Sequence, residues 1–217
     1  MKLELEEAYN IEATVIVADL SQVDSAEKIF QTTEEKKIQV DILINNAGFG
    51  GYGKFYERDL AKDQAMMQVN IVSLVNLTHL YLQGMISRNS GKILHVASTA
   101  GFLPGPLQAV YYATKAFVVS FSQAIAQEIS DTNVTSTALC PGAVATEFVQ
   151  TGNLEGNSMW DNAASPQSVA KCGYDAMLKG KLIAINQPLL SFIINWIIPF
   201  VPRKILLKIS QKSMEKN

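Results

Sequence analysis

Short, nearly continuous apolar runs alternate along the chain with longer segments whose apolar residues recur every three or four positions. The apolar runs, typical of buried strands, are residues 14–19 (TVIVAD), 41–46 (DILINN), 92–98 (KILHVAS), 134–140 (VTSTALC) and 182–185 (LIAI). Helical periodicity covers residues 24–37, 60–86, 109–130 and 166–179. Strands that are apolar on both faces and separated by helices predict an α/β protein with a doubly wound, mostly parallel sheet.

Three further segments complete this pattern. Residues 1–12 have the pattern of the last part of a helix that leads into the strand 14–19, and an irregular segment runs from the strand 134–140 to about residue 164. The helix after it opens with Ser165 and Pro166, a typical N-cap followed by proline in the first turn.

The C-terminal segment contains a strongly apolar run, residues 189–201 (LLSFIINWIIPFV). Asn195 and Pro199 interrupt it, and it is shorter than the ~18 to 20 residues of a membrane-spanning helix. We favour a buried or oligomer-facing helix. The alternatives are an element on a membrane surface, helped by basic residues within 189–208 (Arg203, Lys204 and Lys208), and a cover over a substrate site.

Composition adds limits on size, partners and compartment. With 217 residues, 48% hydrophobic and 18% charged, the chain predicts one domain with a substantial core. A net charge of -2 without a long basic run argues against nucleic acid as a partner. Two cysteines, Cys140 and Cys172, and an acidic start in place of a secretory signal indicate a cytoplasmic protein with free thiols.

Polar residues and glycines stand at the ends of four predicted strands. They are Asp19, the run Asn45–Gly48, Ser98 and the pair Pro141–Gly142. In parallel α/β sheets the carboxyl ends of the strands meet in one crevice, where ligands bind. The sequence therefore predicts that these residues surround a single ligand site.

The helix 109–130 carries a candidate acid. Tyr111 and Lys115 are separated by four residues and so lie on one helix face, where the ammonium is expected to lower the pKa of the phenol. This pair alone is weak support for catalysis, but Ser98 precedes Tyr111 by thirteen residues at a strand end. Tyr112 is excluded as the acid because Ala116 occupies the corresponding position after it.

Taken together and in order, these motifs resemble the short-chain dehydrogenase/reductase family. They are Asn45-Asn46-Ala47-Gly48, Asn70 in QVNIVS, Ser98, Tyr111 with Lys115, Pro141-Gly142, and Asp19 in VADLS. The resemblance covers about residues 8 to 186 and implies one truncated Rossmann-like domain over 1–217, with a core at 1–186 and an apolar and basic helical extension at 187–217.

The resemblance implies an oxidoreductase that interconverts a carbonyl and an alcohol with NADP or NAD, NADP being favoured. Tyr111 would exchange the proton, Ser98 would polarise the substrate oxygen, and Lys115 would lower the pKa of Tyr111 and hold the nicotinamide ribose. Asn70 would position water in a proton path beside Lys115. The residues implied to face the cofactor are Asp19, Asn45, Ala47, Gly48, Tyr111, Lys115, Pro141, Gly142, Val144 and Thr146.

One part of the family pattern has no counterpart here, namely the glycine-rich pyrophosphate loop after the first strand. The run Gly48–Gly53 fits G-x-G-x-x-G, but Asn45–Gly48 already explains its first glycine, and we interpret the match as coincidental. The sequence thus predicts a fold that lacks the first β-α-β unit. The strand 14–19 then either pairs directly with 41–46, or it detaches and the exposed edge of 41–46 pairs with another chain; we favour direct pairing or repair through a dimer. The alternative function is a non-catalytic binding or oligomerisation module.

The remaining signals concern metal, substrate and assembly. His79 and His95 have no partners at metal-binding spacing, so no metal site is expected. Apolar residues in the loops predict an apolar carbonyl or alcohol substrate: Phe102, Leu103, Phe148, Met159 and Trp160. The family resemblance also implies a homo-oligomer.

Overall fold

The computed structural model describes residues 2–156, 160 and 162–215. Within them four strands form one parallel sheet in the order β1-β2-β3-β4. The strands are β1 (Ile42–Asn45), β2 (Gly91–Val96), β3 (Val134–Leu139) and β4 (Ile183–Ala184). The α-helices are α1 (Lys2–Tyr9), α2 (Ser25–Glu35), α3 (Leu60–Met67), α4 (Leu74–Ser87), α5 (Ala109–Glu128), α6 (Phe148–Thr151), α7 (Pro166–Leu178), α8 (Pro188–Phe192) and α9 (Arg203–Met214). Short 3-10 or π turns are η1 (Phe55–Glu57), η2 (Gln68–Ser73), η3 (Thr99–Phe102), η5 (Ile193–Ile197) and η6 (Ile198–Phe200).

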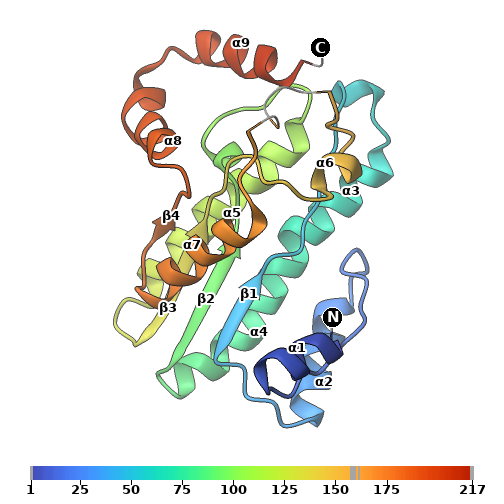
Figure 1. The fold of residues 1–217 in the computed structure, drawn as a ribbon, viewed down its shortest axis with the longest axis vertical. Helices are drawn as coiled ribbons and strands as arrows, with labels where there is room; N and C mark the ends of the chain where they lie inside the picture. The colour runs from blue at the N-terminus through green and yellow to red at the C-terminus, as the bar shows by residue number, and fades with distance from the viewer. Residues whose placement is uncertain (1, 157–159, 161, 216–217) are drawn as a thin grey trace.

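The central strand β2 shows why the sheet needs helices on both faces. Its side chains alternate, so that Ile93 packs with Leu77 and Met85 of α4, whereas Leu94 packs with Met177 of α7. Figure 1 shows α7 on one side of the sheet and α4 and α5 on the other. The expected doubly wound α/β arrangement is confirmed for these strands.

The predicted helices form near their predicted ends. Ser165 caps α7 by accepting a hydrogen bond from the Ser168 backbone N–H at 3.3 Å, and Pro166 occupies its first turn. The predicted helix 60–86 forms as α3 and α4, but a π-helical segment, η2, joins them. The helical pattern does not reveal this interruption, which becomes important for Asn70.

The predicted strand at residues 14–19 is wrong. These residues make no ladder with the sheet, and Val17 is 95% exposed. The β-branched run has the propensity of a strand, but a strand also needs a partner for its backbone groups. The following residue is anchored near the end of β1, because the Ser73 hydroxyl donates a hydrogen bond to the Leu20 carbonyl at 2.8 Å.

Strand β1 is therefore a terminal strand with one incompletely covered face. Leu43 packs into the core beside α4, but Ile44 is 48% exposed and Ile42 is also exposed. Of the two arrangements predicted, direct pairing of residues 14–19 with β1 is wrong, and the detached arrangement is observed. Pairing of the β1 edge with another chain stays a prediction.

The C-terminal segment lies outside the sheet, at the carboxyl end of the strands (Figure 1). In α8, η5 and η6 most large apolar side chains are exposed, and Ile194 is buried. Of the interpretation that we favour, the buried helix is wrong for the single chain, and the oligomer-facing helix stays a prediction. By length and composition one helix in the described part of the chain, Leu60–Ser87, could cross a membrane; here its α4 part packs against β1 and β2.

Candidate active site

Ser98 is held at the turn that follows β2. It is the N-cap of η3, and its Oγ accepts a hydrogen bond from the Ala100 backbone N–H at 3.1 Å. The same hydroxyl lies 3.4 Å from the Pro141 carbonyl oxygen, to which it donates. Ser98 also lies close enough to the Tyr111 phenol to lower its pKa. The strand end and α5 thus bring together two residues that are thirteen positions apart.

Lys115 extends from α5 toward the end of β2. Its ammonium donates a hydrogen bond to the Val96 carbonyl at 2.8 Å and lies 5.8 Å from the centroid of the Tyr111 ring. Both side chains are buried. The expected cluster of Ser98, Tyr111 and Lys115 is therefore present.

Asn70 joins this cluster to the loop after β1. Its amide makes a reciprocal pair with the Phe49 backbone, accepting from N–H at 3.1 Å and donating to the carbonyl at 3.0 Å. It also donates to the Thr114 hydroxyl at 3.1 Å, and that hydroxyl donates to the Tyr111 carbonyl at 2.7 Å. With its side chain held in this way, Asn70 positions loop and helix; the expected water-holding role stays a prediction.

Thr114 was not identified from the sequence. A helical threonine whose hydroxyl returns to the carbonyl three residues earlier is common, so its position in YYATK carries little information by itself. Only the approach of Asn70 from η2 reveals that Thr114 connects the two elements.

The loop after β1 approaches the cluster closely. A Cβ at Gly48 would lie 3.0 Å from Asn70 Oδ1 and 3.5 Å from Lys115 Nζ, and a Cβ at Gly50 would lie 2.8 Å from the Phe148 ring. The glycine run does not open a helix, since η1 begins only at Phe55. This matches our expectation that the G-x-G-x-x-G match is coincidental.

A cavity of about 730 Å³ lies beside the cluster. Six of the predicted catalytic or cofactor-facing residues line it: Gly48, Tyr111, Lys115, Pro141, Val144 and Thr146. Ser98 and Asn70 are buried and do not line the cavity themselves. The carboxyl ends of β1, β2 and β3 therefore do converge on one cavity, as predicted.

Asp19, Asn45, Ala47 and Gly142 do not line this cavity, which corrects their predicted placement. The Asp19 carboxylate is exposed and accepts hydrogen bonds from the Ser21 N–H at 2.9 Å and hydroxyl at 2.7 Å, as a turn residue does.

Asn45 and Gly142 have other local partners. The Asn45 amide donates to the Thr78 hydroxyl at 3.0 Å, and the Gly142 N–H donates to the Asn186 side chain at 3.3 Å. Asn45 and Ala47 line a separate cavity of about 70 Å³. These residues shape the strand ends without reaching the main cavity.

An aromatic wall closes one side of the main cavity. The Phe148 ring lies 5.3 Å from the Tyr111 ring and 6.0 Å from the Trp160 ring. Leu103 packs in the cluster around Tyr111. Phe102 packs instead in the core beside α5, and Met159 lies outside the described residues.

Burial controls the protonation of the cluster. It raises the pKa of the Tyr111 phenol above the usual range, although the side chain of Ser98 acts in the opposite direction. Burial also lowers the pKa of Lys115 to about 8. Burial is the largest effect on the phenol and raises its pKa, so the predicted lowering of the Tyr111 pKa by Lys115 stays a prediction.

The other titratable candidates give no metal site. No group of three or more potential ligands is found among the described residues. His95 is buried beside Phe121, and burial lowers its pKa to about 4, which keeps it neutral. Cys140 and Cys172 are free thiols, as expected.

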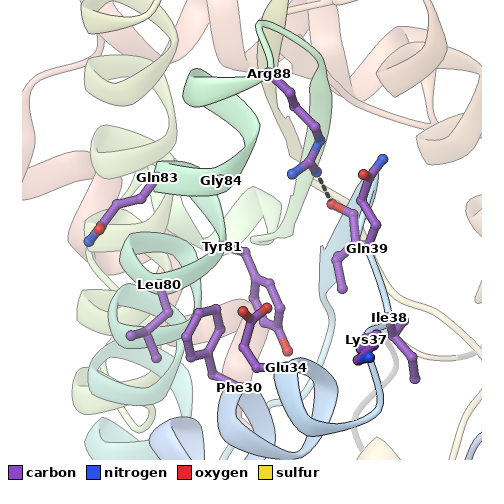
Figure 2. Close-up of a pocket in the computed structure, with 11 residues that line it drawn as sticks. Phe30, Glu34, Lys37, Ile38, Gln39, Leu80, Tyr81, Gln83, Gly84 and Arg88 are labelled. Atoms are coloured by element: carbon purple, nitrogen blue, oxygen red, sulfur yellow. Dashed lines mark hydrogen bonds between the residues drawn. The ribbon is translucent and has the colours of Figure 1, made fainter.

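A second cavity, of about 560 Å³, lies between the ends of α2 and α4 and the amino end of β1. Figure 2 shows its lining, with the Arg88 guanidinium donating a hydrogen bond to the Val40 carbonyl. It contains none of the predicted site residues. The cavity beside Tyr111 is therefore the candidate active site.

Comparison with known proteins agrees with the motifs. The family described as short chain dehydrogenase matches residues 1–156. A 3-oxoacyl-[acyl-carrier-protein] reductase from Synechocystis is 31% identical over 66% of this chain and 58% of that protein. The very-long-chain 3-oxoacyl-CoA reductase of Macaca fascicularis is 28% identical over 95% of this chain and 65% of that protein. The chain thus spans less than two thirds of the length of these relatives.

Solved structures share the fold. A structure described in a study of 7beta-hydroxysteroid dehydrogenase stereoselectivity has a TM-score of 0.85 at 23% identity and covers 96% of this chain and 81% of that one. A short-chain dehydrogenase from Sphingobium yanoikuyae in complex with NADPH has a TM-score of 0.80 at 20% identity, covering 93% and 81%. At these identities the similarity establishes the Rossmann-like fold.

Proposed function

This chain belongs to the short-chain dehydrogenase family, and on that premise we propose that it is an NAD(P)-dependent oxidoreductase that interconverts a carbonyl and an alcohol. The observation that carries the proposal is the buried cluster of Ser98, Tyr111 and Lys115 beside a cavity of about 730 Å³. A phenol with a serine hydroxyl and an ammonium nearby has the groups needed to exchange a proton with a substrate oxygen.

The residues around the cavity fit the nicotinamide end of a dinucleotide. At Gly48 a side chain would fill the space next to Lys115 Nζ, so the glycine keeps the approach to this ammonium open. Thr146 and Val144 also line the cavity. Lys115 would hold the ribose, and Thr146 would contact the carboxamide or phosphate side. When bound, the dinucleotide supplies or accepts the hydride.

The protein's own groups handle the proton. With its pKa raised by burial, Tyr111 is protonated at neutral pH and would donate its proton to the substrate oxygen during carbonyl reduction. Ser98 would donate a hydrogen bond to the same oxygen, which stabilises the charge that develops there. The Lys115 ammonium would stabilise the phenolate that remains.

The aromatic wall favours an apolar substrate. Phe148 and Trp160 line the cavity next to the phenol, and aromatic walls bind apolar groups while a few polar atoms fix orientation. The related enzymes are named as reductases of 3-oxoacyl thioesters. A 3-oxoacyl thioester is therefore the first ketone to test, with NADPH preferred over NADH as cofactor.

Tyr111→Phe tests the proposal, because it removes the phenol hydroxyl and little else. We expect NADPH-dependent ketone reduction by the full chain to fall by about 10²-fold or more, in the range of general acid catalysis. The rate is measured by NADPH absorbance, and circular dichroism checks the fold. Equal turnover of the two proteins contradicts the proposal.

A second candidate is a non-catalytic binding or oligomerisation module. It is favoured by the incompletely covered face of β1 and by the exposed Val15 and Val17. Titration of the protein's fluorescence with NADPH and NADH distinguishes the two functions, since micromolar binding removes the main support for the module. The homo-oligomer and the cytoplasmic location stay predictions.

A further inference from the structure

The C-terminal segment presents a ridge of large apolar side chains. We define the C-terminal ridge as Leu189, Phe192, Trp196 and Phe200, on α8, η5 and η6. Leu189 is 72% exposed, Trp196 67% and Phe200 80%. A few scattered apolar residues are normal on a protein surface, but a contiguous group that includes a tryptophan and two phenylalanines marks a binding surface.

The helix that carries the ridge is too short to cross a bilayer. The apolar helical segment runs from Pro188 to Phe200, whereas crossing needs about 20 residues. Its one amide side chain is satisfied locally, since Asn195 Nδ2 donates to the Ser191 carbonyl at 2.8 Å and lies 3.3 Å from the Ser191 hydroxyl. The segment can therefore lie along an apolar surface with one of its sides buried.

The next helix, α9, has one buried face and a basic face on another side. Leu206, Ser210 and Met214 are buried, and Ser210 donates a hydrogen bond to the Pro104 carbonyl at 2.9 Å. Each of these three residues is preceded, two positions earlier, by an exposed lysine. The lysines are Lys204, Lys208 and Lys212. At 3.6 residues per turn the two sets occupy roughly opposite sides of the helix. The lysines thus face away from the protein.

Both ends of this C-terminal unit contact residues that neighbour the candidate active site in the sequence. Leu190 lies next to Gly142, where an added Cβ would come within 3.2 Å of its side chain. At the other end the Met214 sulfur accepts hydrogen bonds from Gln108 at 3.0 Å and Tyr112 at 3.7 Å. The exposed ridge and the basic face are therefore attached to the loops that bound the catalytic cluster.

We propose that the C-terminal ridge and the basic face of α9 together bind the surface of an anionic lipid membrane. The ridge side chains enter the boundary between headgroups and acyl chains, and the three lysines contact the anionic headgroups. The surface has the two components that such binding combines, an apolar face and adjacent positive charge.

The charge pattern favours a membrane over a second copy of the chain. If two copies met through this surface, the lysine rows of α9 would be brought near one another, and like charges in an interface are unfavourable. The sequence has no acidic residue between Asp175 and Glu215 that could neutralise the charge of these lysines. An anionic surface complements the lysines directly.

The test uses the full chain and vesicles of phosphatidylcholine with or without phosphatidylserine. We expect the protein to sediment with the phosphatidylserine vesicles and much less with phosphatidylcholine alone, and added salt to weaken the binding. Lys204→Glu with Lys208→Glu should lower the affinity by about tenfold or more. The matched control reverses two exposed lysines elsewhere, Lys36→Glu with Lys181→Glu, and should change it little.

The ridge is tested separately. Trp196→Ser with Phe200→Ser should also prevent sedimentation. In Trp160→Phe, where Trp196 is the single tryptophan, phosphatidylserine vesicles should shift the fluorescence to shorter wavelength, and brominated acyl chains should quench it.

Two results overturn the proposal. One is the absence of sedimentation with either kind of vesicle while the protein is folded by circular dichroism. The other is a dimer, measured by light scattering without lipid, that the ridge variant converts to a monomer, because the ridge would then bind a second copy. Both measurements are independent of catalysis, so a failure of the proposed enzymatic activity leaves this test unaffected.

Discussion

Burial of Lys115 lowers the stability of the folded chain, although the proposed reaction needs its ammonium beside Tyr111. Its ammonium is buried with one hydrogen bond, to the Val96 carbonyl. Burial of a cation costs free energy, and this cost appears as the lowering of its pKa from 10.5 to about 8. We expect a cofactor or substrate to compensate this cost when it binds beside the ammonium.

A pH-dependent difference in stability follows from this lowered pKa. Between about pH 8 and pH 10.5 the unfolded chain binds more protons at Lys115 than the folded one, so stability from this residue rises with pH. Lys115→Met removes the contribution. The free energy of unfolding of the wild type, relative to Lys115→Met, should rise by about 3 kcal/mol across this range.

Urea unfolding at both ends of the range measures this difference. Lys36→Met, at an exposed lysine, is the control and should show no comparable change relative to the wild type. A constant difference between wild type and Lys115→Met at all pH values contradicts the assignment of a lowered pKa to Lys115.

At the scale of elements, η2 interrupts the long helix at the point where Asn70 must face the site. π-helical turns inside α-helices are rare and occur often at functional sites. Here the turn lets Asn70 bond both to the Phe49 backbone and to Thr114 on α5. Three elements, the loop after β1, η2 and α5, are joined by these two side chains.

Thr114→Val tests that junction. It keeps the side-chain volume but removes a buried hydroxyl, which leaves the Asn70 amide with one hydrogen bond fewer. We expect a loss of about 1 to 3 kcal/mol in the free energy of unfolding. Thr114→Ser retains the hydroxyl and should lose less. If the valine variant is as stable as the wild type in urea, the Asn70–Thr114 bond does not hold the elements together.

At the scale of the whole molecule, the sheet ends at β1 with Ile42 and Ile44 exposed. An unpaired, apolar terminal strand is a template for pairing with another chain. The residues predicted to cover it, 14–19, lie elsewhere, so this side of the single chain is incompletely covered.

Ile42→Lys should reduce self-association at this edge, because a charge on an edge strand disfavours pairing. Static light scattering over a range of protein concentrations measures the effect. Ile86→Lys places the same charge on α4, at another exposed isoleucine, and should have little effect. Equal scattering by the two variants locates the self-association elsewhere.

The sequence by itself determined the approximate positions of the four predicted core helices, four of the five predicted strands and the cluster of Ser98, Tyr111 and Lys115. It could do so because hydrophobic period and helical spacing are local properties. The strand-end rule placed Ser98 at the ligand site, and the family resemblance added Tyr111 of the following helix to it.

The tertiary structure alone decided the rest. Residues 14–19 have a strand's composition, but a strand exists only when another strand pairs with it. The pKa of Tyr111 depends mainly on how deeply the phenol is buried, and its spacing to Lys115 in the sequence does not predict that burial. The same holds for the C-terminal ridge: apolar residues were evident in the sequence, but only packing could show that they lie outside the core.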